Sequence, residues 1–567
     1  MKFLRVFFLL CGLLGQGFAL DREAFTFTNY KLDVRVEPEQ QRLAVRGKIA
    51  LRNDSAAAQK NLTLQISSSL DWSSIQLAGK PVQFVSHEYT SDIDHTGELS
   101  EAIVTLPQEV PPKGVVELEI GYEGIIPLDA TRLTRIGVPE AQARHSDWDR
   151  ISKSFTAVRG IGYVAWYPIA TEAASLSEGS AVEETVGRWK ARQGGTAMSL
   201  SFESTADAPI FFSGSKDAAA ASTEDKTGKA AAFQMLKVGI SVPTFVIAHY
   251  QALASSDAVT VQYLPGQEEV AQAYGEAAKV DPIIPVGGGP ANLQILGLPD
   301  PDAAAFVSVG MLVSPLKSPI TNEAVMDIVY AKARNSVSSP RAWVQEGLAH
   351  YAQAAFIASE TNRRAALDYL KAHEPILVEE EKDAKPAAGD KSGTIEATRG
   401  LINSPDGLYV QTKAMFVWWM LNEMLGGKLK DVLLTYNSAE DKDPAYVQGL
   451  IEKANHRDWQ WFFDDWVYRD RGLPDFRIDS VYSRQMPNKG YLVTVTVGNL
   501  GNAGAEVPVT VRTESTEITQ RLEVRAKTKG SVRIETTSPP LEVVVNDGSV
   551  PESGSGNNTF KVNAAAK

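Results

Sequence analysis

The sequence predicts an α+β protein of several domains: a β domain at the N-terminus, a mostly helical middle domain and a β sandwich at the C-terminus. Two observations lead to this prediction. The chain has 567 residues, whereas one domain usually takes about 100 to 200. Apolar and polar residues alternate in its first and last parts, as in strands, and apolar residues recur at intervals of three and four in the middle, as in amphipathic helices.

Residues 20–250 are expected to form the N-terminal β domain. Runs such as YKLDVRVEP and GVVELEIGY are separated by Asn, Asp, Pro and Gly, which is typical of antiparallel strands. MSLSFES near residue 198 and VTVQYLPG near residue 259 continue the β pattern. The stretch between them near 216–231 is rich in Ala, Ser, Thr and Lys, so we expect it to be mobile.

Residues 251–478 are expected to form the middle domain. Helical spacing is found in EEVAQAYGEAAKV, NEAVMDIVYAKARN, RAWVQEGLAHYAQAAFIA and TKAMFVWWMLNEMLG. Residues 378–396 are charged, contain Pro and Gly and have few large apolar side chains, which predicts an exposed loop. GGGP at 287–290 is expected to be a turn, because Pro290 and a strand-like run follow it instead of a helix.

Residues 479–567 are expected to form the C-terminal domain. GYLVTVTVGNLG, AEVPVTVRTES, TQRLEVRA, GSVRIETTS and PLEVVVNDG follow one another at short, regular intervals. This spacing of strands is typical of a small immunoglobulin-like sandwich.

Composition and the first residues bear on partners and location. The 69 acidic residues outnumber the 56 Lys and Arg residues, so we expect neither nucleic acid nor an anionic membrane as a partner. Residues 1–19 resemble a secretory signal peptide, with Lys2 and Arg5 before an apolar run and Ala19 at the cleavage site. No later run approaches the roughly 18 apolar residues of a membrane helix, so we expect a secreted, periplasmic protein with no membrane span after cleavage. Lipidation of Cys11, the only cysteine, is a less favoured alternative because no small residue precedes it.

The segment WVQEGLAHY at 343–351 resembles WLNEGFAxY of the membrane alanyl aminopeptidase family, a group of gluzincin zinc peptidases. Further stretches fit that family in the same order: YKLDV near the N-terminus, VAWYP at 164–168, LYVQTKAMFVWWML at 408–421 and DWQWFFDDWVYRDRGLPDF at 458–476. The resemblance covers residues 25–478 and implies a thermolysin-like middle domain, a zinc cofactor and aminopeptidase activity.

The resemblance also identifies what this chain lacks. In the family, two His of an HExxH helix bind zinc, the Glu between them activates water, and the Glu of NEG, here Glu346, is the third ligand. None of the seven histidines of this chain lies four residues from another. The stretch that should carry the family's amine-binding Glu has only Val307, Ser308 and Val309. We therefore expect no zinc cofactor and a non-catalytic member of the family.

Two registers can place the lost positions on the helix before Glu346. The usual family spacing puts the two His positions at Glu323 and Asp327, and these two carboxylates could then join Glu346 in a site for a hard cation. A shorter connection puts them at Tyr330 and Arg334, and Arg334 could then pair with Glu346 in the space of the metal. We favour the second register because the helix then runs directly into the SSP break.

Two further residues are weaker candidates. His350 lies one helical turn after Glu346 and could complete a metal half-site, although an exposed or hydrogen-bonded pair is the favoured interpretation. Tyr409 resembles the family's transition-state tyrosine, but strict alignment on Lys413 puts Gln411 at that position.

Three hypotheses of function remain at this point. The first is a pseudoenzyme that binds a peptide or a protein. The second is an active metallo-aminopeptidase with an atypical metal site, and the third is a structural module of the cell envelope that acts through its C-terminal sandwich.

Overall fold

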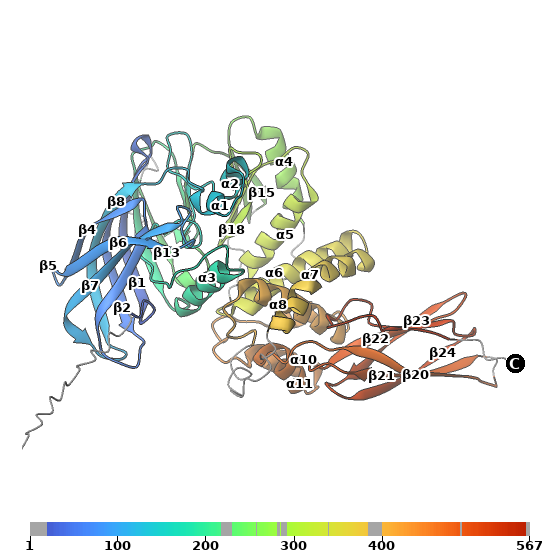
Figure 1. The fold of residues 1–567 in the computed structure, drawn as a ribbon. Helices are drawn as coiled ribbons and strands as arrows, with labels where there is room; N and C mark the ends of the chain where they lie inside the picture. Colours follow the sequence, from blue (N-terminus) through green and yellow to red (C-terminus); the bar gives the residue numbers. More distant parts are fainter. Residues whose placement is uncertain are drawn as a thin grey trace, which may run out of the picture.

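The computed structural model describes residues 20–216, 230–256, 258–280, 284, 292–337, 339–383, 400–487 and 490–562. Figure 1 shows three parts in succession: blue and cyan sheets, a green and yellow part with long helices, and orange sheets toward the C-terminus. The multidomain α+β fold predicted from the sequence is confirmed. The predictions for residues 1–19 and 287–290, and most of the segment 216–231, lie outside the described residues.

The N-terminal part is built on an eight-stranded sheet with the order β12-β13-β10-β1-β2-β8-β4-β5. In β1, Leu32, Val34 and Val36 are buried while the residues between them are exposed, which is the alternation expected of a strand with one face on a core. The strands are β1 (Phe25–Glu37), β2 (Arg42–Asn53), β4 (Leu70–Leu77), β5 (Lys80–Pro81), β8 (Val115–Ile125), β10 (Ala197–Ser204), β12 (Ser215–Lys216) and β13 (Ala230–Met235).

Smaller elements complete this part. A second sheet has the order β3-β7-β6 and a third the order β11-β14-β9. Their bounds, with those of the helices, are β3 (Gln59–Ser67), β6 (Gln83–Thr90), β7 (Glu98–Val110), β9 (Thr156–Val158), β11 (Ile210–Phe212), β14 (Phe245–Ile247), η1 (Pro38–Gln40), α1 (Thr131–Arg135), α2 (Glu140–Ser146), α3 (Ala181–Arg192) and η3 (Val238–Ile240).

The middle part begins with a five-stranded mixed sheet, although the sequence predicts a mostly helical domain from the same residues. The order is β15-β16-β17-β19-β18, with bounds β15 (Gln251–Ser256), β16 (Val259–Tyr263), β17 (Leu293–Gly297), β18 (Phe306–Ser308) and β19 (Met311–Ser314). VTVQYLPG therefore belongs to this sheet and does not extend the N-terminal domain. These strands have three to six residues, which is too short for periodicity to separate them from other apolar runs.

All four helices predicted from apolar spacing are present, as α4 (Glu268–Ala277), α5 (Asn322–Ser336), α6 (Ala342–Glu360) and α8 (Gly407–Met424). The remaining ones are α7 (Arg363–Asp383), α9 (Leu429–Leu433), α10 (Tyr446–Asn455), α11 (Gln460–Phe463) and the π-helical η4 (Asp464–Tyr468). Within the described part of the chain, none is both long and apolar enough to cross a membrane.

The end of α7 corrects the prediction of a loop at 378–396, because residues 378–383 are helical. Leu377 is buried and anchors this turn, and the Glu381 carboxylate accepts hydrogen bonds from the Leu473 N–H and the Ser553 hydroxyl. A charged helix end is thus held by the next domain instead of projecting into solvent. Residues 384–396 lie outside the described residues.

The C-terminal part consists of two antiparallel sheets, β20-β21-β24 and β23-β22-β25-β26. Its first strand begins at Phe476, three residues before the expected boundary. Buried valines of β21 and β22 share one apolar cluster with the helices of the middle part, so the two parts have a continuous core. The bounds are β20 (Phe476–Gln485), β21 (Tyr491–Asn499), β22 (Ala505–Arg512), β23 (Glu517–Val524), β24 (Lys529–Thr536), β25 (Glu542–Val545) and β26 (Thr559–Lys561).

Helix α3 of the N-terminal part docks against the segment that leads into α8 (Figure 1). The approach is so close that a Cβ atom on Gly187 would lie 1.7 Å from the Pro405 carbonyl oxygen. Only a glycine permits this contact, which brings the last turn of α3 to the middle part.

We expect Gly187→Ala to lower the free energy of unfolding by about 2 kcal/mol, because the overpacked backbone contact outweighs the higher helix propensity of Ala. Gly449→Ala is the matched control, because Gly449 is an exposed helical glycine with open space around its Cβ position, and it should raise stability by about 0.5 to 1 kcal/mol. Denaturant unfolding of both variants checks this prediction, and equal effects of the two would contradict it.

The junction between α7 and the C-terminal sheets contains two acids whose pKa values are raised by burial. The Glu552 backbone N–H donates to Glu374 Oε1 at 3.0 Å, and the Glu552 carboxylate accepts from Asn546, Asn558 and the Phe476 N–H. Burial raises the pKa of Glu552 to about 7 against these donors, and the pKa of Glu374 is raised as well.

Because the folded state holds the proton of Glu552 more tightly than the unfolded state, the favourable contribution of the neutral acid is complete below pH 4.5 and is lost as the pH rises through about 7. We expect Glu552→Gln to remove this pH dependence, so that the wild type loses stability relative to the variant over that range. Unfolding midpoints measured at several pH values test this. Glu535→Gln, at an exposed position of β24, should leave the slope unchanged.

Candidate functional site

Glu346 on α6 is held by two side chains from α5. Tyr330 donates its hydroxyl to Glu346 Oε2 at 2.5 Å, and Arg334 donates Nε–H to Glu346 Oε1 at 3.0 Å. Tyr330 and Arg334 are four residues apart, so one face of α5 presents both to α6. These are the two positions of the shorter register, and Arg334 and Glu346 form the ion pair expected in it.

The longer register is wrong for a carboxylate site. Glu323 is exposed, and Asp327 lies close enough to Tyr274 of α4 for its charge to affect that hydroxyl. Burial, and then the charge of Glu323, raises the pKa of Asp327 to about 6. In the described part of the chain, no three His, Cys, Asp or Glu side chains come close enough together to hold a metal ion, so Glu323 and Asp327 do not join Glu346.

A lysine of the N-terminal part also acts on this site. Lys190 lies in the last turn of α3, and burial lowers its pKa while the charge of Glu346 opposes that shift. Burial favours the neutral form of Glu346, but Arg334, the Tyr330 hydroxyl and Lys190 together outweigh it and lower the pKa of Glu346. Glu346 is therefore an anion at neutral pH, although its side chain is only 24% exposed.

The two ring nitrogens of His350 each lie within hydrogen-bond distance of a glutamine side chain. Its Nδ1 lies 2.9 Å from Gln353 Oε1, and its Nε2 lies 3.2 Å from Gln411 Oε1. The amide of Gln353 is fixed in orientation, because its Nε2–H donates to the Met326 carbonyl and its Oε1 also accepts from Tyr369.

The protonation of His350 follows from this network. Burial lowers the pKa of His350, so the ring is neutral at pH 7 and carries one proton, which Nδ1 donates to Gln353. Nε2 then carries no proton, and the Gln411 atom nearest to it is the acceptor Oε1. In the described residues, His350 does not belong to any group of three His, Cys, Asp or Glu side chains that could hold a metal ion, so it does not fit the role of a recruited ligand.

Tyr409 belongs to a buried group around a lysine. Its hydroxyl accepts from Lys413 Nζ at 2.8 Å, and the same ammonium donates to Asp470 at 2.9 Å. The backbone N–H of Tyr409 donates to Asp406, which caps α8. Gln411, the residue that strict alignment puts at the tyrosine position, is the one in contact with His350.

The side chains around Glu346 do not fit the zinc ion that the sequence resemblance implies. A guanidinium has no lone pair to donate and repels a cation. Burial, and then the charge of Glu346, keeps the pKa of Tyr330 well above its usual range, so this hydroxyl remains a hydrogen-bond donor. One carboxylate is left where zinc sites have at least three protein ligands.

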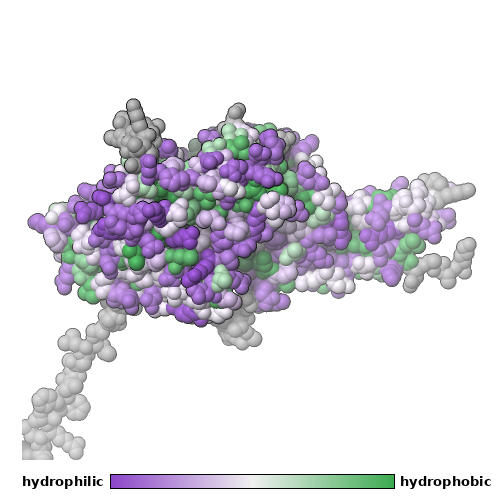
Figure 2. Space-filling view, turned by 90° about the horizontal axis from the view of Figure 1, so that it is seen from above, coloured by the Kyte–Doolittle hydropathy of each residue, from purple (hydrophilic) through white to green (hydrophobic). Residues whose placement is uncertain are grey.

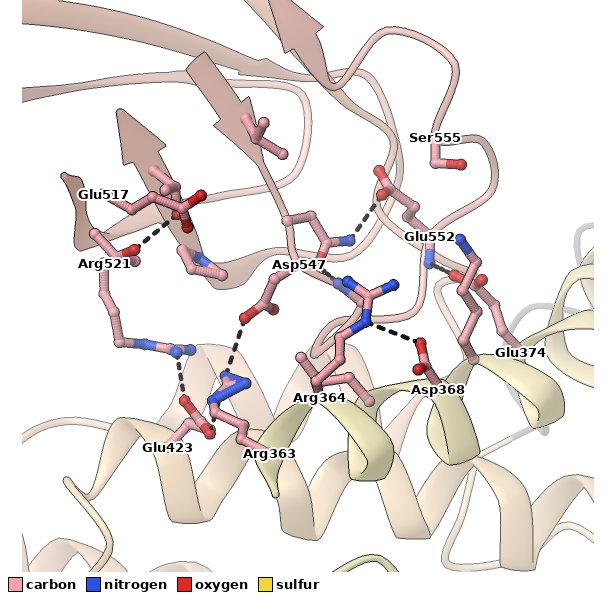
Figure 3. Close-up of a pocket in the computed structure, with 18 of the residues that line it drawn as sticks. Arg363, Arg364, Asp368, Glu374, Glu423, Glu517, Arg521, Asp547, Glu552 and Ser555 are labelled. Carbon is pink, nitrogen blue, oxygen red and sulfur yellow. Dashed lines mark hydrogen bonds and ion pairs between the residues drawn. The ribbon is translucent and has the colours of Figure 1, made fainter. Parts of the chain in front are cut away.

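A polar pocket of about 640 Å³ lies elsewhere, between α7 and the C-terminal sheets (Figure 3). Arg363 of α7 extends between Glu423 of α8 and Asp547, at 3.2 and 3.1 Å, and Arg521 donates to Glu423 at 2.8 Å. Its cations are largely paired with its own acids, so the pocket has the character of a domain junction.

In Figure 2, hydrophilic residues cover most of the visible face, and hydrophobic ones form separate patches.

Comparison with known proteins gives a likeness of fold alone. No protein-family model and no curated protein matches the chain. Among solved structures, the M1 zinc metallopeptidase of Deinococcus radiodurans is similar at 12% identity and a TM-score of 0.42, over 76% of this chain and 91% of that one. A point mutant of it gives 13% and 0.44 over 80% and 96%, and the mutant bound to a Tyr-Ser-Ala substrate gives 14% and 0.43 over 78% and 94%. This likeness does not establish a family or an activity for the chain.

We expect Arg334→Met to lower the free energy of unfolding by about 2 kcal/mol, because it leaves the largely buried Glu346 carboxylate without its counter-ion. Adding Glu346→Gln should recover part of the loss, and the pair's contribution should disappear as the pH falls below 4.5, since the pKa of Glu346 is lowered in the folded state. Denaturant unfolding of the single and double variants measures both effects.

The matched control is the exposed ion pair of Arg144 and Glu140 on α2, where Arg144→Met should change stability by less than about 0.5 kcal/mol. An Arg334→Met variant that loses no more stability than this control would contradict a stabilising interaction between Arg334 and Glu346.

Proposed function

We propose that this chain is an exported, non-catalytic relative of the membrane alanyl aminopeptidase family and that it binds a peptide or a protein in the periplasm. The ordered motifs of the sequence support the relationship, and residues 1–19 support export. The observation that carries the absence of catalysis is the contact of Arg334 and Tyr330 with Glu346.

The position of the family's general base also supports a loss of catalysis. In the shorter register this base corresponds to Ala331, which is buried in the apolar cluster formed by α4, α5 and the five-stranded sheet. A carboxylate at this place would be removed from water without a partner. In the described residues around Glu346, these contacts support the absence of both a metal-binding set and a group to accept the proton of a water molecule.

A binding role is compatible with the polar groups that remain. Glu346, Lys190 and Gln411 come from three helices in two domains, and all three side chains are partly exposed. Such a set can recognise the backbone and the charged groups of a polypeptide without changing it chemically.

We expect purified protein to contain far less than about one zinc ion per chain and to leave aminoacyl reporter substrates intact. Tyr330→His with Arg334→His should restore a three-ligand set with Glu346 and bring zinc to about one ion per chain, still without hydrolysis because no base is present. Metal analysis after dialysis against zinc, followed by the reporter assay, tests this.

Glu323→His with Asp327→His is the matched control, because it introduces the same two imidazoles about two turns earlier on α5, and it should gain no zinc. A wild-type protein that holds one zinc ion and loses reporter hydrolysis with a chelator would overturn the proposal in favour of an active metallo-aminopeptidase.

A further inference from the structure

The pocket between α7 and the C-terminal sheets is lined by acids of two kinds. Four of them form an ion pair with an arginine of the same pocket, at distances between 3.0 and 3.2 Å: Asp368 with Arg364, Glu423 and Asp547 with Arg363, and Glu517 with Arg512. Glu374 and Glu552 line the same pocket but form no ion pair with any described residue. These two acids are therefore the ones that a cation from outside could pair with.

Glu374 and Glu552 lie against each other at one end of the pocket (Figure 3), where the Glu552 N–H donates to Glu374 Oε1 at 3.0 Å. The donors to the Glu552 carboxylate are all neutral, namely the side-chain amides of Asn546 and Asn558 and the Phe476 N–H. Burial, with a smaller contribution from the charge of Glu374, raises the pKa of Glu552 against these donors. The two acids thus have hydrogen bonds but no opposite charge.

A third acceptor lies beside this pair and has no partner. Asn558 donates its Nδ2–H to Glu552 Oε1, and the Oδ1 of the same amide accepts no hydrogen bond from any described residue, although Asn558 is only 5% exposed. A buried carbonyl oxygen normally has a donor. A ligand that carries a positive charge and several N–H donors, as an ammonium or a guanidinium group does, would satisfy both this oxygen and the pair of acids.

One lysine of the chain also acts on Glu374. Lys371 lines the pocket about one turn earlier on α7, and its charge opposes the rise in the pKa of Glu374 that burial causes. Its side chain is exposed and forms no ion pair with Glu374, so both carboxylates stay open to another cation.

The size and the ligand set of the pocket favour an organic cation over a metal ion. A volume of about 640 Å³ is that of a pocket for a small organic group. In the described part of the chain, no third acidic, thiol or imidazole side chain joins these two acids to make a metal site.

We propose that Glu374, Glu552 and Asn558 bind an organic cation, an ammonium or a guanidinium group, in the pocket between α7 and the C-terminal sheets. A basic side chain or the N-terminal amine of a polypeptide carries such a group. The site is separate from the region around Glu346, so the inference does not depend on whether the chain is catalytic.

The test uses the full chain and four small probes. Three carry one cationic group each: Nα-acetyl-lysine methylamide, Nα-acetyl-arginine methylamide and alanine methylamide. The fourth, Nα,Nε-diacetyl-lysine methylamide, resembles the first but has no charge. We expect at least one cationic probe to bind about tenfold more tightly than the neutral one, since hydrogen bonds between charged groups are stronger than those to a neutral donor. Ligand-observed NMR titration at about pH 7.5, where most of Glu552 is ionised and the amines keep their charge, gives the dissociation constants. The probe that binds most tightly identifies the kind of cation.

Glu374→Gln and Glu552→Gln should each remove the preference for the cation, although glutamine keeps the shape of the side chain and an acceptor oxygen. Glu517→Gln is the matched control and should retain the preference, because Glu517 lines the same pocket but is paired with Arg512. Equal affinity of the wild type for cationic and neutral probes, no binding of any cationic probe, or an unchanged preference in either folded variant would overturn the inference. An equal loss in Glu517→Gln would also overturn it, because binding would then follow the net charge of the pocket instead of the two unpaired acids.

Discussion

The contact between the Arg334 guanidinium and the Glu346 carboxylate determines the character of the region between α5 and α6. A carboxylate that is mostly withdrawn from water requires a counter-charge, and in this chain the protein itself supplies it. The consequences extend to each neighbour. Tyr330 keeps its proton and donates it to the same carboxylate, and the ring of His350 packs against Tyr330 at 4.9 Å between ring centres. The charge of Glu346 is thus matched by Arg334, and the neighbouring aromatic and imidazole rings pack around this pair.

Close packing of helices makes this arrangement possible. A Cβ atom on Gly347 of α6 would lie 2.4 Å from the Ala414 Cβ of α8, which shows how tightly these two helices approach. The same closeness at Gly187 brings the N-terminal domain against the start of α8. Basic residues of two domains therefore lower the pKa of Glu346, and its environment depends on how the domains dock as well as on its own helix. The short connection after Ser336 has a related effect, since it leaves α5 no length to shift its register against α6.

The sequence predicts the long helices α5, α6 and α8, but it does not predict α7 or most of the short strands of the middle part. α5, α6 and α8 have 15 to 19 residues and repeat their apolar positions over several turns, whereas β17, β18 and β19 have three to five residues and no resolvable period. At the site, the positions of Tyr330 and Arg334 opposite Glu346 follow from the continuity of the chain between two predicted helices. Lys190 and Gln411 have no such local signal, because each reaches the site through tertiary docking. The charged end of α7 is predicted to be a loop for the same reason, because the residues that stabilise it as a helix lie in the C-terminal domain.

A fixed guanidinium beside a carboxylate supports different chemistry from a metal ion at such a place. A zinc ion offers an open coordination position beside its ligands, and a substrate oxygen or a water molecule can enter it. The guanidinium of Arg334 donates its Nε–H to Glu346 and is held in one orientation by this bond. It therefore neutralises the carboxylate without activating a water molecule. Deprotonation would need a base, but Ala331 lies in an apolar cluster and the two ring nitrogens of His350 lie against Gln353 and Gln411. Under the proposed function, these side chains would act on a ligand as hydrogen-bond donors, which select a partner by charge and shape and leave its bonds unchanged.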